Sequence, residues 1–106
     1  MAVLILVQGA LAGSHLTGAD AALGLHRTLG AEVLTVLGLA VVITAAGAVR
    51  THPWALPASI AGLLALGAQI GMGFSDQLHI HVPLGIGLFG LYLAMALTLT
   101  VKETTT

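Results

Sequence analysis

Four long stretches without a charged residue constrain this chain more than any other feature. They cover residues 1–19, 33–49, 53–75 and 82–101. A transmembrane helix needs about 20 predominantly apolar residues, so these stretches have the length of membrane crossings. We therefore expect an all-α integral membrane protein. Its four transmembrane helices are predicted near residues 2–17, 24–49, 54–74 and 80–101.

The composition agrees with this class and excludes several others. Apolar residues make up 58% of the chain and charged residues only 7%, whereas a soluble domain carries about a quarter charged residues. Three Lys plus Arg and a net charge of −1 make a nucleic-acid partner unexpected. The absence of cysteine excludes disulfides, thiolate metal sites and a Cys nucleophile. We expect one domain, residues 1–106, embedded in the lipid bilayer.

The few charged residues predict an orientation. Arg50 and Lys102 lie on the same side of the predicted bundle as the N-terminus, and Arg27 lies on the other side. Because cytoplasmic loops carry the excess of Lys and Arg, we expect a multi-pass protein of the cell membrane with both termini cytoplasmic. The first stretch has no basic residues before it and is not interpreted as a cleaved signal peptide. Residues 18–25 are expected to form an amphiphilic loop or an extension of the second helix.

Small residues are dense on all four segments, with 14 glycines in the chain. Such residues let helices approach closely in lipid, where no hydrophobic force drives helices together. The spacing of the segments leaves only short connections, which is typical of helix bundles. We therefore predict a compact four-transmembrane-helix bundle.

The sequence contains an internal repeat. The second segment opens with His26-Arg27-Thr28-Leu29-Gly30 and the fourth with His81-Val82-Pro83-Leu84-Gly85, so both read H-x-x-L-G. The segment before each carries a lone glutamine, Gln8 or Gln69. The bundle therefore consists of two repeated helical hairpins, residues 1–49 and 54–101. Hairpins with the same direction of crossing are related by an axis along the membrane normal.

This symmetry places His26 and His81 at the same depth, near the outer ends of the second and fourth helices. Two imidazoles that face each other across a bundle can hold a flat metal cofactor between them. Haem iron takes axial histidine ligands, and bundle cores build such sites from facing helices. The alternative is that each histidine is a polar boundary residue that contacts lipid headgroups or a loop carbonyl group.

Three neighbouring residues are further candidates for cofactor binding. His79 competes with His81 as the ligand, because residues two apart on a helix point to roughly opposite faces; otherwise it lies in the loop or faces a haem propionate. His15 ends the first segment, where it makes a second haem contact or is exposed to solvent. Arg27 is the expected partner of the haem propionates, because a guanidinium group pairs with a carboxylate; the alternative partners are Asp20 and lipid phosphate.

Glu32 is the only acidic residue well inside a predicted span, six residues beyond His26. An ionised carboxylate there is costly unless it is paired. It is interpreted either as an acceptor for a ligand imidazole or a proton-relay group, or as a protonated side chain bonded to a glutamine or a carbonyl group. The side chains of Gln8 and Gln69 are expected to bond across the bundle.

These residues resemble haem A synthase, a membrane enzyme family built from two similar four-helix bundles. In that family the second helix of each bundle begins with a His-Arg pair and the fourth carries a matching His. His26-Arg27 and His81 fall on those positions, and the Gln-Gly patterns of the first and third helices are similar. The resemblance covers nearly the whole chain but only one of the two bundles. The chain is also similar to small four-helix membrane proteins of actinobacterial type.

The resemblance implies a haem-binding bundle rather than the family's oxidation chemistry. Leu23 stands where the catalytic bundle of the family has an acidic residue, and the chain lacks the cysteine pair of many members. We therefore do not expect an enzyme.

The first hypothesis is a haem b-binding membrane protein with axial ligation by His26 and His81. It would act in electron transfer or haem handling, as a homodimer or as a subunit of a larger membrane complex such as a respiratory complex. The second is a cofactor-free structural subunit that packs through its Gly/Ala-rich helix faces. The third is a small transporter, with Glu32, Gln8 and Gln69 along a polar path.

Overall fold

The computed structural model describes residues 1–105 of the chain, and the side chains of residues 1–100. This part of the chain is helical and contains no β-strand. The elements are α1 (Ala2–Leu16), α2 (Asp20–Thr28), the π-helical turn η1 (Leu29–Val33), α3 (Leu34–Gly47), α4 (Ala55–Phe74) and α5 (Leu78–Thr105). Because α2, η1 and α3 follow one another without a break, they form one continuous helix.

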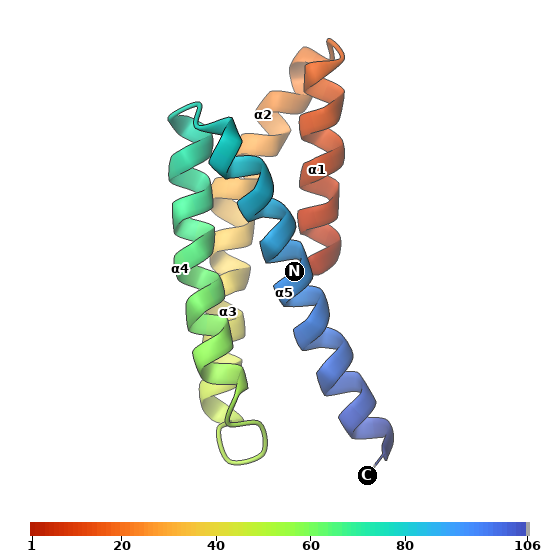
Figure 1. The fold of residues 1–106 in the computed structure, drawn as a ribbon, viewed down its shortest axis with the longest axis vertical. Helices are drawn as coiled ribbons and strands as arrows, with labels where there is room; N and C mark the ends of the chain where they lie inside the picture. Colours follow the sequence, from red (N-terminus) through yellow and green to blue (C-terminus); the bar gives the residue numbers. More distant parts are fainter. Residues whose placement is uncertain (106) are drawn as a thin grey trace.

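The helices form two hairpins whose tips lie at the same end of the molecule (Figure 1). The first hairpin consists of α1 and the continuous α2–η1–α3 helix, and the second of α4 and α5. α3 packs along α4 and α4 along α5, while α1 packs against both α2 and α5. The predicted bundle of two hairpins with the same direction is therefore confirmed, and residues 20–25 extend the second helix.

Three helices are long and apolar enough to cross a membrane, judged by length and composition: Asp20–Gly47, Ala55–Phe74 and Leu78–Thr100. The first helix is shorter than expected. α1 has 15 residues, which at 1.5 Å per residue is about 22 Å, against about 30 Å for a hydrocarbon core. Figure 1 accordingly shows α1 beside only the upper part of the bundle. Three of the four predicted spans are thus present at full length.

Both hairpin tips end their first helix in the same way. In the first tip the N–H of Ala19 donates to the carbonyl of Ser14 and the N–H of Gly18 to that of His15. In the second tip Gln77 donates to Met72 and Asp76 to Gly73. These are the paired bonds of the Schellman motif, which needs a left-handed residue after the helix. Gly18 (φ 107°) and Asp76 (φ 56°) supply it.

The tips differ in length, although the motif that closes them is the same. Gln8 precedes the left-handed residue of its tip by ten positions and Gln69 by seven, and His26 follows by eight positions and His81 by five. Each arm of the first hairpin is therefore three residues longer, nearly one helical turn. The α1–α2 tip rises above the α4–α5 tip for this reason (Figure 1).

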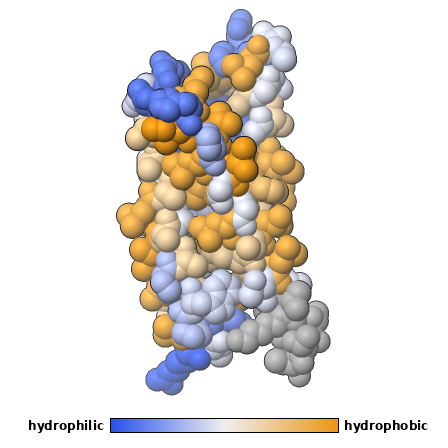
Figure 2. Space-filling view, viewed as in Figure 1, coloured by the Kyte–Doolittle hydropathy of each residue, from blue (hydrophilic) through white to orange (hydrophobic). Residues whose placement is uncertain are grey.

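The packed core lies in the middle of the bundle, below the two histidines. Its buried members come from α3, α4 and α5 and are Leu34, Leu66, Leu88, Tyr92 and Met95. Many other apolar side chains are exposed, and Figure 2 shows them gathered over the middle of the molecule with polar residues at both ends. This is the surface expected of a protein whose solvent is lipid rather than water.

Candidate functional site

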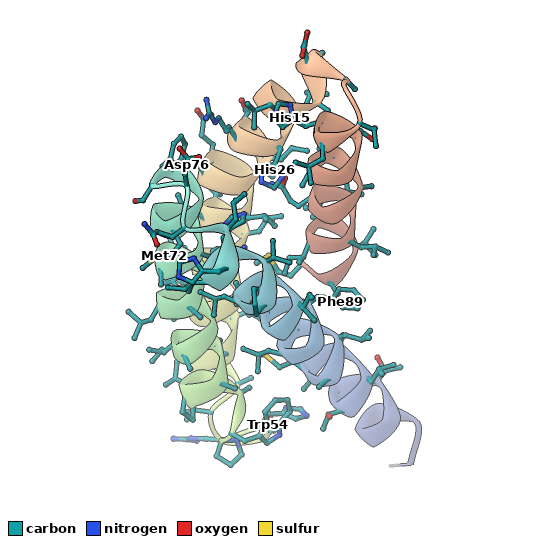
Figure 3. The ribbon with its side chains drawn as sticks, turned by 45° about the horizontal axis from the view of Figure 1, so that its top comes forward. His15, His26, Trp54, Met72, Asp76 and Phe89 are labelled. Carbon is teal, nitrogen blue, oxygen red and sulfur yellow. The ribbon has the colours of Figure 1, made fainter. Side chains whose placement is uncertain are left out.

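The structure brings His26 of α2 and His81 of α5 together near the hairpin tips. Their ring centroids are 6.0 Å apart and the ring planes are inclined by 74°. Both rings are partly buried. Figure 3 shows His26 in the upper part of the molecule, far from Trp54 at the opposite end. The sequence repeat therefore correctly predicted that these two residues lie together, and their rings meet edge to face.

Each histidine ring is held by a backbone carbonyl of the preceding helix. Nδ1 of His26 lies 3.1 Å from the carbonyl oxygen of Gln8, and Nδ1 of His81 lies 2.8 Å from that of Gln69. A carbonyl oxygen can only accept a hydrogen bond, so Nδ1 must carry the proton in both rings. Nε2 is then the unprotonated nitrogen, with a lone pair free to ligate a metal. Metal-binding histidines commonly donate their other N–H in this way.

Glycines let the helices approach closely enough for these bonds. A methyl group in place of the Gly30 hydrogen would lie 3.0 Å from Nε2 of Gln8, and one at Gly85 would lie 2.8 Å from Nε2 of Gln69. Both glycines follow their histidine by four residues and end the H-x-x-L-G repeat. The repeat thus encodes a histidine and, one turn deeper, a space that the glutamine side chain of the neighbouring helix fills.

The expected hydrogen bond between the side chains of Gln8 and Gln69 is not formed. Among the described side chains, both amide atoms of Gln8 and Oε1 of Gln69 are buried without a hydrogen-bond partner. Their contribution to the site comes from the backbone carbonyl groups instead. A buried amide without a partner costs about 1–3 kcal/mol, so these side chains make the interior next to the histidines unusually polar.

Gly73 supports His81 directly. A methyl group at Gly73 would lie 2.7 Å from Cε1 and 2.9 Å from Nδ1 of the His81 ring, well inside ordinary contact distance. The absence of a side chain at this position therefore makes room for the ring. Sequence reasoning did not identify Gly73, because in a chain this rich in glycine its position alone carried no signal.

The remaining cofactor-binding candidates lie around the pair without joining it. His79 is exposed, so His81 rather than His79 faces the bundle interior. His15 is half-buried in the same upper region (Figure 3), and its buried Nδ1 has no hydrogen-bond partner among the described residues. Arg27 is exposed, and its guanidinium carbon lies 5.5 Å from the ring centroid of Phe74, a cation–π contact.

Glu32 lies away from the pair. It is exposed on the outside of the π-helical turn, while Gln8 is buried inside the bundle. Glu32 is therefore not the acceptor for the His26 ring, a role that the carbonyl of Gln8 fills. For the same reason Glu32 and Gln8 do not line one polar path in the part of the chain that the structure describes.

Within the described residues, no group of three or more His, Cys, Asp or Glu side chains could hold a metal ion. The two imidazoles of His26 and His81 are instead adjacent, with their ring centroids 6.0 Å apart. Such a pair can complete the coordination of a metal that brings its other ligands in a plane of its own.

Comparison with protein-family models, with curated proteins and with solved structures found no match to this chain.

Proposed function

We propose that this chain is a membrane protein that binds haem b between His26 and His81, for electron transfer or haem handling near one face of the bilayer. The observation that supports it is the pair of facing imidazoles, each with Nδ1 committed to a carbonyl oxygen. Because a metal–imidazole bond is about 2.0 Å long, two imidazoles on opposite sides of one ion have ring centroids roughly 6 Å apart. The observed 6.0 Å fits this spacing.

Gly30 and Gly85 leave space against their helices one turn deeper than the two histidines, and the glutamine amides now occupy that space. Without cysteine in the chain, the haem would be held without thioether links. The proposal also agrees with the resemblance to one bundle of haem A synthase.

Each residue of the site has a distinct task in this proposal. His26 and His81 would supply the two axial nitrogens, and the carbonyls of Gln8 and Gln69 would fix the orientation of the rings. Arg27, next to His26 and at the polar end of the molecule, would pair with the propionates. Bound haem supplies one-electron redox chemistry, which two histidine ligands favour by leaving no open coordination position.

The test is the visible spectrum of the protein purified in mild detergent, oxidised and dithionite-reduced, before and after addition of haemin. We expect a sharp Soret band with split α and β bands on reduction, and its loss in His26→Ala and in His81→Ala. His79→Ala and His52→Ala are matched controls, because His79 is exposed and His52 lies in the turn before α4, away from the pair, and they should keep the spectrum. A protein that stays colourless with haemin, or ligand variants that bind as the controls do, would overturn the proposal.

A second candidate is a cofactor-free subunit that packs against other membrane proteins through small residues. Gly67 and Gly71 of α4 favour it, since a methyl group at either would meet no atom within 4 Å. Open glycines on a helix surface permit close approach of another helix. Under this function His26→Ala and His81→Ala would assemble with the partner proteins as the parent does.

A further inference from the structure

Glu32 occupies a position that the proposed haem site does not explain. Twelve residues of the continuous helix precede it and fifteen follow, about 18 Å and 22 Å at 1.5 Å per residue. Glu32 lies five residues, about 8 Å, deeper than Arg27, so in a helix that crosses the bilayer it lies inside the hydrocarbon region. Its side chain is exposed, and lipid tails offer a carboxyl group neither a donor nor an acceptor.

The residues around Glu32 form a regular apolar stripe. Glu32 lies near the start of α3, and the members that follow it along α3 are spaced by four, three and four residues: Val36, Leu39 and Ile43. These three side chains are between 47% and 73% exposed. A 3.5-residue repeat of apolar side chains is the pattern by which two helices pack along each other. We call this set the Glu32 stripe.

Among the residues whose side chains the structure describes, none from another helix covers the Glu32 stripe. α3 packs along α4, and it does so through a different face, whose buried residues are Leu34, Gly38 and Ala45. Gly38 lies against Leu63 and Leu66 of α4. Beside the carboxyl group the surface has a hollow of about 270 Å³, lined by Glu32, Val33, Val36 and Leu37, which offers room for a side chain of a neighbouring helix.

We propose that the Glu32 stripe is the interface of a homodimer, in which the Glu32 carboxyl groups of two copies bond to each other inside the bilayer. The partner of Glu32 must present a hydrogen-bonding group at the same depth in the bilayer. A second copy related by an axis along the membrane normal does so by symmetry, because its stripe runs parallel and each residue meets its own equivalent. A protonated carboxyl group both donates and accepts, so it is complementary to itself.

This inference rests on the membrane crossing within the proposed function and is independent of the haem. Its test is the dimer fraction of purified protein in liposomes, measured by energy transfer between two dye-labelled populations over a range of protein-to-lipid ratios. Glu32→Ala should weaken dimerisation by about five-fold or more, the scale of one interhelical hydrogen bond in lipid. Glu32→Gln, which keeps a donor and an acceptor, and Leu64→Ala, an exposed residue of α4, should dimerise as the parent does.

A second measurement locates the contact directly, because the chain has no cysteine of its own. Leu39→Cys should form a disulfide-linked dimer on mild oxidation in the membrane, since residue 39 would meet its equivalent, whereas Leu64→Cys, whose two copies would lie apart in the same dimer, should not be cross-linked. A monomer at every protein density, a Glu32→Ala variant that dimerises like the parent, or equal cross-linking at both positions would overturn the proposal. Haem spectra of the same samples separate the two hypotheses: a colourless dimer would refute only the haem site.

Discussion

Replacing Gly73 by alanine tests whether haemin binding depends on the position of the His81 ring and not only on the presence of a histidine. The new methyl group would lie 2.7 Å from Cε1 of His81. To regain an ordinary contact of 3.4 Å, the ring must retreat from α4 by about 0.7 Å. Because Gln69 also belongs to α4, this movement lengthens the 2.8 Å bond between Nδ1 and the Gln69 carbonyl beyond hydrogen-bond range.

The magnitude follows from that lost bond. A hydrogen bond of this kind contributes about 1 kcal/mol, and loss of the group that orients a metal-binding histidine typically costs about 10–100-fold in affinity. We expect Gly73→Ala to bind haemin about 10–100-fold more weakly than the parent while it still folds, since alanine is the better helix former. Haemin titration followed at the Soret band measures the affinity, and circular dichroism reports the helix content.

Gly71→Ala is the matched control. It lies two residues earlier on the same helix, and its methyl group would have no atom within 4 Å. Its haemin affinity should equal that of the parent. If Gly73→Ala and Gly71→Ala bind haemin equally well, the ring of His81 has no required position and the geometric reasoning fails.

Two further predictions concern the bundle and its orientation. A methyl group at Gly62 would lie 2.9 Å from the hydroxyl oxygen of the buried Tyr92, so Gly62→Ala should lower the free energy of unfolding by about 1–3 kcal/mol. Gly67→Ala has open space and should be neutral or stabilising; equal thermal transitions of the two variants in detergent would contradict this packing. For orientation, Thr17→Cys should react with an impermeant maleimide added to intact cells and His52→Cys only after permeabilisation; the reverse result would refute the predicted cytoplasmic termini.

The helices and the central pair could be predicted because they depend on spacing alone. The uncharged stretches predicted the positions of the helices in the sequence. The repeated H-x-x-L-G predicted that His26 and His81 lie opposite each other. The same repeat also contains Gly30 and Gly85, which lie against the side chains of Gln8 and Gln69. Their equal spacing from the two histidines is the sequence signal for these two positions.

Other parts of the site could not be predicted, for physical reasons. The bonds from the histidines go to backbone carbonyls, which every residue possesses, so no residue type marks them. The face on which Glu32 lies was predictable in part. Six residues at about 100° each separate Glu32 from His26 by about 120° around a regular helix. The π-helical turn that contains Glu32 has no recognisable sequence pattern.

The differences between the two hairpins are informative about the site. Their tips are closed by different residues, Gly18 and Asp76, and their arms differ by nearly a turn. Beyond the histidines the helices also depart from regular α geometry in different ways, by the π-helical turn in one and by Pro83 in the other. The bond from Nδ1 to a glutamine carbonyl and the glycine four residues later are nevertheless present in both.

A repeat that served only to pack helices would have no reason to keep these particular features while its tips and helix geometry diverged. Packing in lipid is satisfied by many arrangements of small residues. An oriented imidazole with a free Nε2, by contrast, needs a carbonyl within hydrogen-bond distance of Nδ1, and both hairpins supply one. The features that the two hairpins share are therefore those that the proposed haem site would use.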